Sequence, residues 1–242
     1  MIDLPSLRKE TRYGMPAADQ ILFNRYYVTG YSYYFRQPKW VMEIVNPPVI
    51  NESKGLERSD NFRPDYRIPQ MFRADLVDFK DSGYDRGHMV PSADQIGMEI
   101  QNSETFLLSN MSPQKPELNR NIWRELENEI RRLNEKESIL ETYVVTGPIF
   151  NFDQPVTTIG TKDSNDVSIP VPHAYFKSVL TEDKKGNLKM WSFMLKNEGS
   201  DQPLNSFLVP TSKIEQYAGI KLWDRLVGSE TEKEKKKVRT MW

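Results

Sequence analysis

The 242-residue sequence contains no cysteine and only two histidines. Without cysteine, the chain has no disulfide bond, thiolate zinc site, iron–sulfur cluster or thiol nucleophile, and its redox compartment stays undetermined. Two histidines are too few for a metal site built from three imidazoles. An imidazole that transfers protons near neutral pH must therefore belong to His88 or His173.

Long apolar runs are missing as well. The longest, such as residues 47–50 and 207–210, fall far short of the roughly 20 apolar residues of a membrane helix. The N-terminal stretch MIDLPSLRKETRYG lacks the apolar centre of a secretory signal. We therefore expect no membrane span. The chain is either cytoplasmic or the mature part of a targeted precursor, mitochondrial in a eukaryote and periplasmic or secreted in a bacterium.

Neither sign of charge is in excess. The 33 Lys and Arg residues nearly balance the 34 Asp and Glu residues, which gives a formal net charge of −1. Nucleic-acid-binding domains are often strongly basic, so this balance argues mildly against such a partner. No linear segment is strongly basic either, since residues 54–88 hold seven basic and seven acidic side chains. A cationic binding surface would have to be assembled in three dimensions.

Aromatic and β-branched runs predict strands, because such side chains fit a pleated, half-buried surface. These runs are residues 25–35, 39–45, 106–108, 142–145, 167–171, 174–180 and 189–195. Turn-forming residues at 36–38 and 184–187 join two pairs of these runs into antiparallel hairpins. With one strong helix between the strands, the pattern predicts an α+β fold, a single domain with a largely antiparallel central sheet flanked by helices.

The clearest helix is predicted over residues 118–135, where apolar residues recur at spacings of four, four and three. A shorter helix over residues 212–218 should end at Gly219, because glycine readily adopts the left-handed conformation that closes many helices.

The domain division follows from the charge pattern near the C-terminus. The run ETEKEKKKVR at residues 230–239 is typical of a solvated tail. We therefore predict a lead-in at residues 1–11, one domain at 12–226 and a charged tail at 227–242.

His88 lies in the short sequence Asp85-Arg86-Gly87-His88. Arginine offers a planar fork for phosphate oxygens, histidine moves protons near neutral pH, and glycine permits a close backbone approach. The spacing alone leaves two interpretations open, a catalytic site or a charged loop with a structural histidine. His173, at the entrance of a predicted strand, is interpreted as structural.

A second group of polar side chains follows the start of the strong helix. Asn119, Trp123 and Glu127 succeed one another at steps of four and so share one side of the helix. An asparagine at this position is usually a helix cap, but its carbonyl oxygen is also a ligand that Mg²⁺ accepts. Glu127 is either a surface carboxylate or a residue that holds a metal-bound water.

Three motifs in combination resemble those of a known family. They are Asp85-Arg86-Gly87-His88, Ser109-Asn110-x-x-Pro113-Gln114, and Leu118-Asn119-x-x-x-Trp123 followed by Glu127. This set resembles the DNA/RNA non-specific endonucleases of the ββα-metal (His-Me finger) class. Further segments, among them Arg12–Pro16, Glu57–Arg63 and Val171–His173, are similar to the endonuclease G branch, so the resemblance covers roughly residues 10–225.

The resemblance implies a role for each matching residue. His88 matches the general base that activates the attacking water, and Asn119 matches the protein ligand of one Mg²⁺, for which Mn²⁺ can substitute. Glu127 matches the carboxylate that orients the waters of that ion. The remaining matches are Arg86 and Arg58, which contact phosphate or stabilise the transition state, Asn110, an active-site asparagine, and Trp123, a packing residue.

The resemblance also implies an activity and partners. It implies Mg²⁺-dependent hydrolysis of single- and double-stranded DNA and of RNA with little sequence specificity, 5′-phosphate and 3′-hydroxyl products, and a homodimer. Three rival functions remain open: a catalytically silent nucleic-acid-binding module, a metal-dependent phosphodiesterase of small molecules, and a structural interaction domain.

Overall fold

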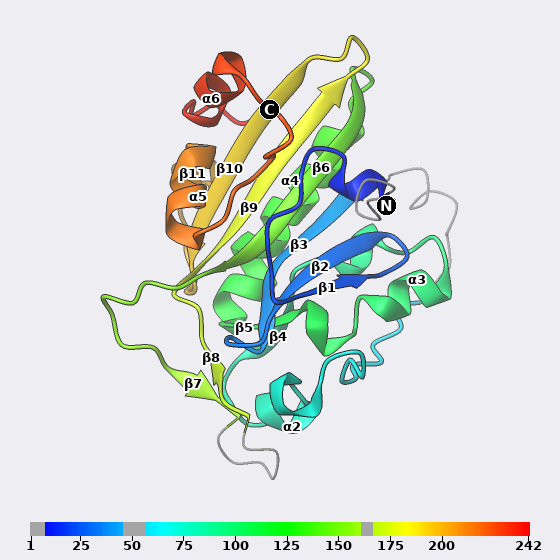
Figure 1. The fold of residues 1–242 in the computed structure, drawn as a ribbon, viewed down its shortest axis with the longest axis vertical. Coiled ribbons are helices and arrows are strands. Elements are labelled where there is room, and N and C mark those ends of the chain that lie inside the picture. The colour runs from blue at the N-terminus through cyan, green and yellow to red at the C-terminus, as the bar shows by residue number, and fades with distance from the viewer. Residues whose placement is uncertain (1–7, 46–56, 161–166) are drawn as a thin grey trace.

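A seven-stranded antiparallel sheet forms the centre of the molecule (Figure 1). The computed structural model describes residues 8–45, 57–160 and 167–242. In spatial order the strands are β1 (Gln20–Phe23), β2 (Tyr27–Ser32), β3 (Gln37–Val45), β6 (Ile139–Ile149), β9 (Ala174–Asp183), β10 (Leu188–Lys196) and β11 (Leu208–Val209). The structure thus confirms the predicted mixed fold with a largely antiparallel sheet.

Both predicted hairpins are present, but one turn lies elsewhere than expected. All of β10 pairs with β9, and β2 pairs with β3. The turn predicted at residues 36–38 is wrong, because Gln37 and Pro38 already pair with β2. The chain turns earlier and ends the turn at Arg36, whose φ of 53° is the left-handed conformation that closes tight turns.

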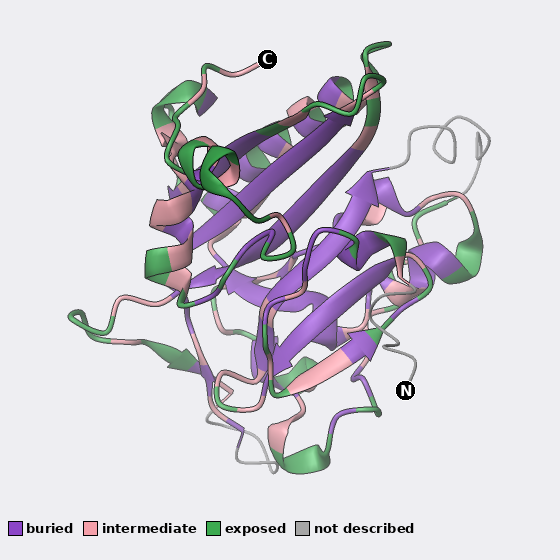
Figure 2. Cartoon of the chain, turned by 45° about the horizontal axis from the view of Figure 1, so that its top comes forward, coloured by how far each residue is buried: buried purple, intermediate pink, exposed green. Residues whose placement is uncertain are grey.

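The sheet is covered on both faces, and its strands are therefore buried along most of their length (Figure 2). One face packs against the helix α4 (Arg124–Asn134) through the core that contains Trp123, Leu126 and Ile130. The opposite face packs against α5 (Thr211–Ala218) and the segment that follows it, which ends in Trp223. Burial on both faces explains why the strands read as nearly continuous apolar runs rather than as alternating patterns.

A small ββα unit lies on the α4 face of the sheet. The strands β4 (Asp85–His88) and β5 (Met111–Gln114) pair with each other as a separate antiparallel ribbon. The chain then enters η6 (Leu118–Trp123), a π-helical segment that continues directly into α4. The predicted single helix over residues 118–135 is therefore two joined helical forms, and π-helical turns are frequent at functional sites.

The remaining elements are short. They are η2 (Lys9–Thr11), η3 (Gln70–Phe72), α2 (Leu76–Phe79), η4 (Ser92–Asp94), α3 (Glu99–Glu104), η5 (Leu108–Asn110), β7 (Thr158–Ile159), β8 (Ile169–Pro170), η7 (Leu204–Phe207) and α6 (Ser229–Lys235). The strand predicted at residues 106–108 is wrong, since this stretch makes only one bridge, between Leu107 and Arg63. In the described part of the chain, none of the helices has the length and apolar character that crossing a membrane requires.

The C-terminal residues differ from the predicted solvated tail. They form α6 and then run back across the sheet, where the indole Nε1 of Trp191 donates to the carbonyl of Thr240 at 3.0 Å. Trp242 packs edge-on against Trp191 and Phe193, and its own Nε1 donates to the carbonyl of Glu129 at 3.0 Å. The tail thus helps to fix α4 on the sheet.

This packing predicts a measurable contribution of the last residue to stability. We expect Trp242→Ala to lower the free energy of unfolding by about 1–3 kcal/mol, because it removes apolar contacts with two aromatic rings and a hydrogen bond to α4. Val238→Ala, at an exposed position of the same segment, should change it by less than about 0.5 kcal/mol. Urea denaturation measures both values, and equal, small effects would show that the tail is solvated after all.

Candidate active site

The ββα unit and α4 enclose a cavity of about 510 Å³. Five of the residues assigned by the resemblance line it, namely Arg58, Arg86, His88, Asn119 and Glu127. They come from an irregular segment, from β4, from η6 and from α4, so the fold brings together side chains up to 69 positions apart in the sequence. Their catalytic and metal-binding roles stay predictions, but their convergence is a property of the structure.

The position of His88 is set by the β4–β5 ribbon. His88 pairs with Met111, and Gly87 pairs with Ser112 across the ribbon. A Cβ atom at position 87 would lie 2.1 Å from the Oε1 atom of Gln114, so only glycine allows β4 to approach this side chain. The expected close approach at Gly87 is therefore present.

Asn110 lies behind His88 rather than in the cavity. Its fully buried amide accepts a hydrogen bond from the backbone N–H of Val90 and donates to the carbonyls of Val90 and Thr105, at 2.9–3.0 Å. The amide is thus fully occupied by backbone groups and fixes the chain just after His88. This position suits a residue that orients the histidine, and it gives Asn110 no direct access to a substrate in the cavity.

Two phenylalanines, which the sequence reasoning missed, enclose the His88 imidazole. Phe62 and Phe106 meet it edge-on, with ring centroids 5.6 and 5.0 Å from its own. Each phenylalanine in turn carries an arginine on its face, Arg86 over Phe62 at 4.1 Å and Arg58 over Phe106 at 4.9 Å. Guanidinium groups stack well on aromatic faces, so the rings hold two cations beside the histidine.

These surroundings keep the imidazole neutral. Burial, followed by the charges of Arg58 and Arg86, lowers the pKa of His88 from 6.5 to about 3. The Nε2 atom is buried and has no hydrogen-bond partner among the described residues, which leaves Nδ1 as the ring nitrogen that can reach water. At neutral pH the imidazole is thus unprotonated and able to act as a base.

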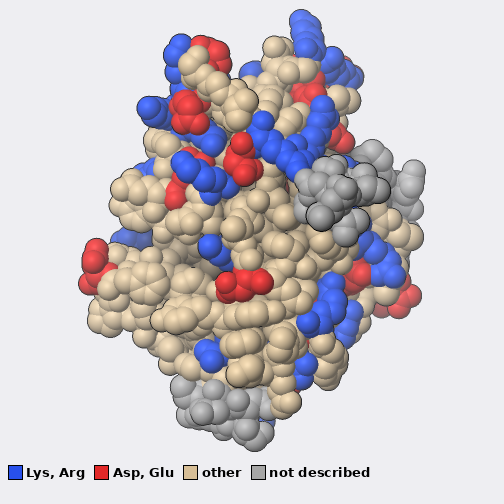
Figure 3. Space-filling view, in the orientation of Figure 1, with Lys and Arg blue, Asp and Glu red and all other residues tan. Residues whose placement is uncertain are grey.

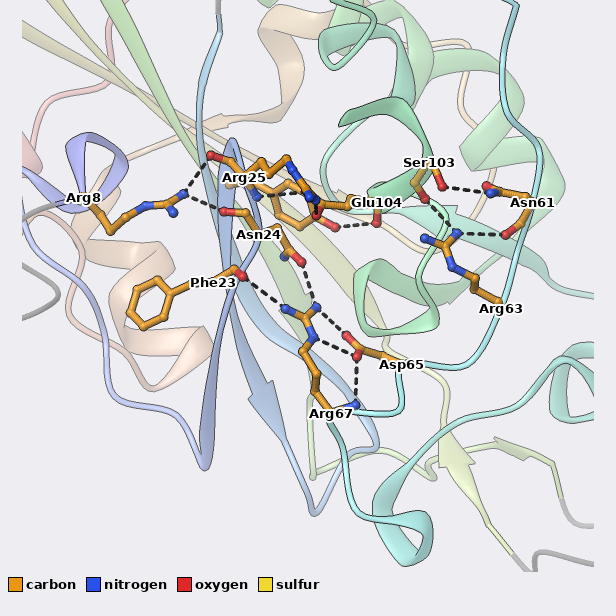
Figure 4. A network of polar contacts seen from close by, with 11 residues as sticks. Arg8, Phe23, Asn24, Arg25, Asn61, Arg63, Asp65, Arg67, Ser103 and Glu104 are labelled. Atoms are coloured by element: carbon orange, nitrogen blue, oxygen red, sulfur yellow. Dashed lines mark hydrogen bonds and ion pairs between the residues drawn. The ribbon is translucent and has the colours of Figure 1, made fainter. Parts of the chain in front are cut away.

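A network of polar contacts anchors the segment that carries Arg58 (Figure 4). The backbone N–H of Ser59 donates to the side chain of Asn102, and the amide of Asn61 donates to the hydroxyl of Ser103 at 2.8 Å. Arg63 donates to the carbonyl of Ser103 at 2.9 Å. The segment is therefore tied to α3 and to the end of this helix, which leads to Phe106. Arg58 extends from the segment with half of its side chain exposed.

Asn119 faces His88 from the first turn of η6, and Asp85 fixes its orientation. The Nδ2 atom of Asn119 donates to the carboxylate of Asp85 at 2.9 Å. Arg120 grips both oxygens of that carboxylate, at 2.8 and 2.7 Å, and these hydrogen bonds help to lower the pKa of Asp85. The Oδ1 atom of Asn119 is left without a protein partner among the described residues and is free to bind an ion or a water. The sequence reasoning gave Asp85 no role.

Glu127 lies in the first turn of α4, at the edge of the cavity. Its side chain is 12% exposed, and its Oε1 atom lies 3.7 Å from the ammonium group of the buried Lys177. Burial raises the pKa of Glu127 to about 7 even though Lys177 and Arg131 act in the opposite direction. Between Asn119 and Glu127, Trp123 turns inward and packs against Tyr175 in the core, as a packing residue would.

The donor set fits a divalent ion held mainly by water. The described residues contain no group of three His, Asp or Glu side chains that could bind a metal ion by themselves. An ion here would use the free oxygen of Asn119, a hard ligand of the kind Mg²⁺ prefers, and keep several waters, which Mg²⁺ tolerates. Glu127 is placed to accept hydrogen bonds from such waters.

The charge of the cavity differs from that of the whole chain. Five arginines line it against two carboxylates: Arg58, Arg86, Arg120, Arg124 and Arg131 against Asp85 and Glu127. On the face of the molecule shown in Figure 3, by contrast, basic and acidic side chains are interspersed. The cationic surface that no linear segment provides is thus assembled from β4, η6, α4 and the Arg58 segment.

His173 is placed as a structural residue. Its Nδ1 atom accepts a hydrogen bond from the backbone N–H of Asn151, and its Nε2 atom lies 3.1 Å from the carbonyl of Pro155. Both ring nitrogens are thus engaged by backbone, and the residue does not line the cavity.

Comparisons with known proteins identify the family of the chain. The family model for DNA/RNA non-specific endonucleases matches residues 6–229. The chain belongs to the DNA/RNA non-specific endonuclease family. It is similar to a nuclease of Syncephalastrum racemosum, with 35% identity over 215 residues, which cover 83% of this chain and 66% of that protein.

Human mitochondrial endonuclease G is 32% identical over 219 residues, which cover 86% of this chain and 71% of that protein. A chain in the crystal structure of the EndoG/EndoGI complex superposes with a TM-score of 0.82 and 30% identity, over 90% of this chain and 91% of that one. These matches confirm the endonuclease G branch, and the protein is a nuclease and hence a hydrolase.

The lowered pKa of His88 predicts how this endonuclease responds to acid. An unfolded histidine gains its proton near pH 6.5, whereas the folded one gains it only near pH 3, so the unfolded state binds more protons in this interval. The free energy of unfolding should fall as the pH drops below 6.5, by up to about 1.4 kcal/mol per pH unit from this residue.

The variant His88→Asn cannot take up this proton. We expect the difference in unfolding free energy between the variant and the wild type to shift in favour of the variant between pH 7 and pH 4.5. Urea denaturation at the two pH values measures this difference. A difference that does not depend on pH would show that the folded imidazole titrates normally.

Proposed function

We propose that the protein is a Mg²⁺-dependent endonuclease that hydrolyses phosphodiester bonds of DNA and RNA with little sequence specificity. The observation that carries this proposal is the neutral imidazole of His88, which lies between Arg58 and Arg86 in the same cavity as the free amide oxygen of Asn119. Family membership supplies the nuclease class. The arrangement in the cavity supports separate roles for His88 as the base and for Asn119 as the metal ligand.

In this mechanism Arg58 and Arg86 bind the oxygens of the scissile phosphate. Both are already held on phenylalanine faces, so they lose little freedom when the substrate enters. The phosphate charge then offsets the two guanidinium charges that lower the pKa of His88. The imidazole therefore becomes a better base at the moment when the substrate is in place.

His88 takes a proton from the attacking water at Nδ1, the ring nitrogen that is not buried. Asn119 would hold the divalent ion through Oδ1, with its amide oriented by Asp85. The chemistry supplied by the bound ion is charge neutralisation at the phosphate and at the leaving oxygen. Glu127 would orient water on the ion. The bond between phosphorus and the 3′-oxygen then breaks, and this oxygen takes a proton from water, which gives the 5′-phosphate and 3′-hydroxyl ends that the resemblance implies.

The shape of the surface favours a polymer over a small molecule as substrate. A cavity of about 410 Å³ adjoins the first and shares Asp85 and Arg86 with it, and another of about 440 Å³ shares Arg124 and Asn128 with it on the other side. The three cavities are neighbours on the surface, and the site lies in the one that shares residues with both of the others. The cations of the site are suited to phosphates rather than to base edges, which supports low sequence specificity.

The activity is tested with supercoiled plasmid DNA and single-stranded RNA, each incubated with Mg²⁺ and with or without a chelator. We expect nicking and linearisation of the plasmid and degradation of the RNA, both abolished by the chelator. Absence of cleavage by the pure, folded protein would refute the proposal. Release of a small-molecule phosphodiester product, without cleavage of either polymer, would favour the rival phosphodiesterase.

The two histidines provide a matched pair of variants for the general base. We expect His88→Ala to lower kcat by roughly 10²–10⁴-fold, the usual contribution of general acid–base catalysis, while DNA binding persists. His173→Ala, whose imidazole bonds only to backbone groups, should cleave at a rate close to that of the wild type. Normal cleavage by His88→Ala would disprove the assignment, and loss of binding as well would point to a structural role.

Asn119 is tested through the metal dependence of the reaction. We expect Asn119→Ala to need a higher Mg²⁺ concentration for half-maximal cleavage and to lose kcat, because the only protein oxygen assigned to the ion is removed. A Mg²⁺ titration of plasmid cleavage measures both effects. An unchanged titration curve would contradict this role. The homodimer implied by the resemblance stays a prediction, which light scattering in solution tests.

A further inference from the structure

A lysine is buried beneath the candidate active site, and the mechanism described so far does not use it. Lys177 lies on β9 with its side chain 1% exposed. Its ammonium group donates to the hydroxyl of Thr146 at 3.0 Å and lies 3.5 Å from the carbonyl of Met89. It also lies 3.7 Å from Glu127 and 4.9 Å from the centroid of the Trp123 ring.

These contacts join the two elements that carry the proposed chemistry. Met89 directly follows His88 at the end of β4, whereas Trp123 and Glu127 belong to η6 and the first turn of α4. The ammonium group thus touches the chain on both sides of the cavity. It approaches them from the central sheet.

Lys177 belongs to a larger group of buried charges. The carboxylate of Asp94, 4% exposed, pairs with Arg131, and Glu43, 2% exposed, accepts a hydrogen bond from Gln95 at 3.4 Å. Glu127 has no other partner than Lys177 among the described residues. Lys177 is therefore the cation that pairs with the carboxylate of Glu127 at the cavity.

Burial of such a group costs folding energy. Taking a lysine out of water costs several kcal/mol, and replacement of a buried ion pair by apolar residues is often neutral or stabilising. An apolar residue at position 177 alone would instead leave the buried carboxylates of Glu43, Asp94 and Glu127 without this cation. The presence of a lysine calls for a role that an apolar side chain cannot fill.

We propose that Lys177 is a positioning residue of the nuclease reaction: it fixes the carboxylate of Glu127 at the edge of the cavity and couples α4 to the strand end that bears His88. This inference rests on the proposed function. Lys177 does not touch the substrate, because its side chain is enclosed by protein. Its effect reaches the reaction through the placement of Glu127 and, by way of Met89, of His88.

The test compares two buried lysines that each pair with a glutamate. Lys235, 4% exposed, binds Glu215 at 2.9 Å and joins α6 to α5 on the opposite side of the sheet from the cavity. Lys177→Met and Lys235→Met therefore remove the same charge from similarly buried positions. Circular dichroism and thermal unfolding establish that each variant is folded at the assay temperature, and plasmid cleavage gives kcat and KM.

We expect Lys177→Met to lower kcat by roughly 10–100-fold, as is typical when a partner that orients an active-site ligand is lost, and to leave KM for DNA nearly unchanged. It should also raise the Mg²⁺ concentration for half-maximal cleavage. Lys235→Met should retain the kcat and the Mg²⁺ dependence of the wild type. A wild-type kcat in folded Lys177→Met overturns the inference, and so does an equal loss of kcat in both variants, because it marks a general effect of buried charge.

If Lys177→Met does not fold, Thr146→Val takes its place, since it removes the oxygen that holds the ammonium group and keeps the charge. We expect a lower kcat with an unchanged KM, and wild-type kinetics would overturn the inference. The wild-type protein in the same assay separates the two proposals. If it does not cleave, the proposed function fails, whereas cleavage by the wild type and by the variants alike refutes only the role of Lys177.

Discussion

Two-sided burial of the central sheet determines where the elements of the candidate active site lie. The sheet has an apolar face toward α4 and another toward α5, and both must be covered to remove them from water. The apolar side of α4, with Leu126 and Ile130, therefore lies on the sheet, and the neighbouring Glu127 and Arg131 line the cavity between α4 and the β4–β5 ribbon. The cavity is the space between these two elements. The packing of α4 on the sheet therefore decides which of its side chains line the cavity.

The positive charge around that cavity is a local property that the net charge of the chain does not reveal. A net charge of −1 for the whole chain coexists with five arginines and two carboxylates around one cavity. Two of the arginines lie on the phenylalanines that enclose His88, so the same contacts that place the cations also keep the imidazole neutral. The position of the two cations and the neutral state of the imidazole are thus two effects of one packing arrangement.

Much of the fold could be predicted from local patterns. The hairpin between β9 and β10, the end of α5 at Gly219 and the strong helix all depend on periodicity or on turn-forming residues, which are properties of contiguous sequence. The π-helical start of that helix, the single bridge at Leu107 and the packed C-terminal residues were missed. The last two depend on partners distant in the chain, Arg63 for Leu107 and the carbonyl of Glu129 for Trp242.

The sequence by itself determined the chemistry that is available. It limits the candidate bases to two histidines and excludes thiols, and the family resemblance of the motifs around His88 and Asn119 implies a phosphodiesterase site. Only the tertiary structure decided how these groups act. It engages His173 with backbone groups, places Asn110 behind the site, and surrounds His88 with Phe62 and Phe106. The reason is physical: residue identity fixes the functional group, whereas burial, neighbouring charge and orientation, which set its reactivity, come from residues far away in the sequence.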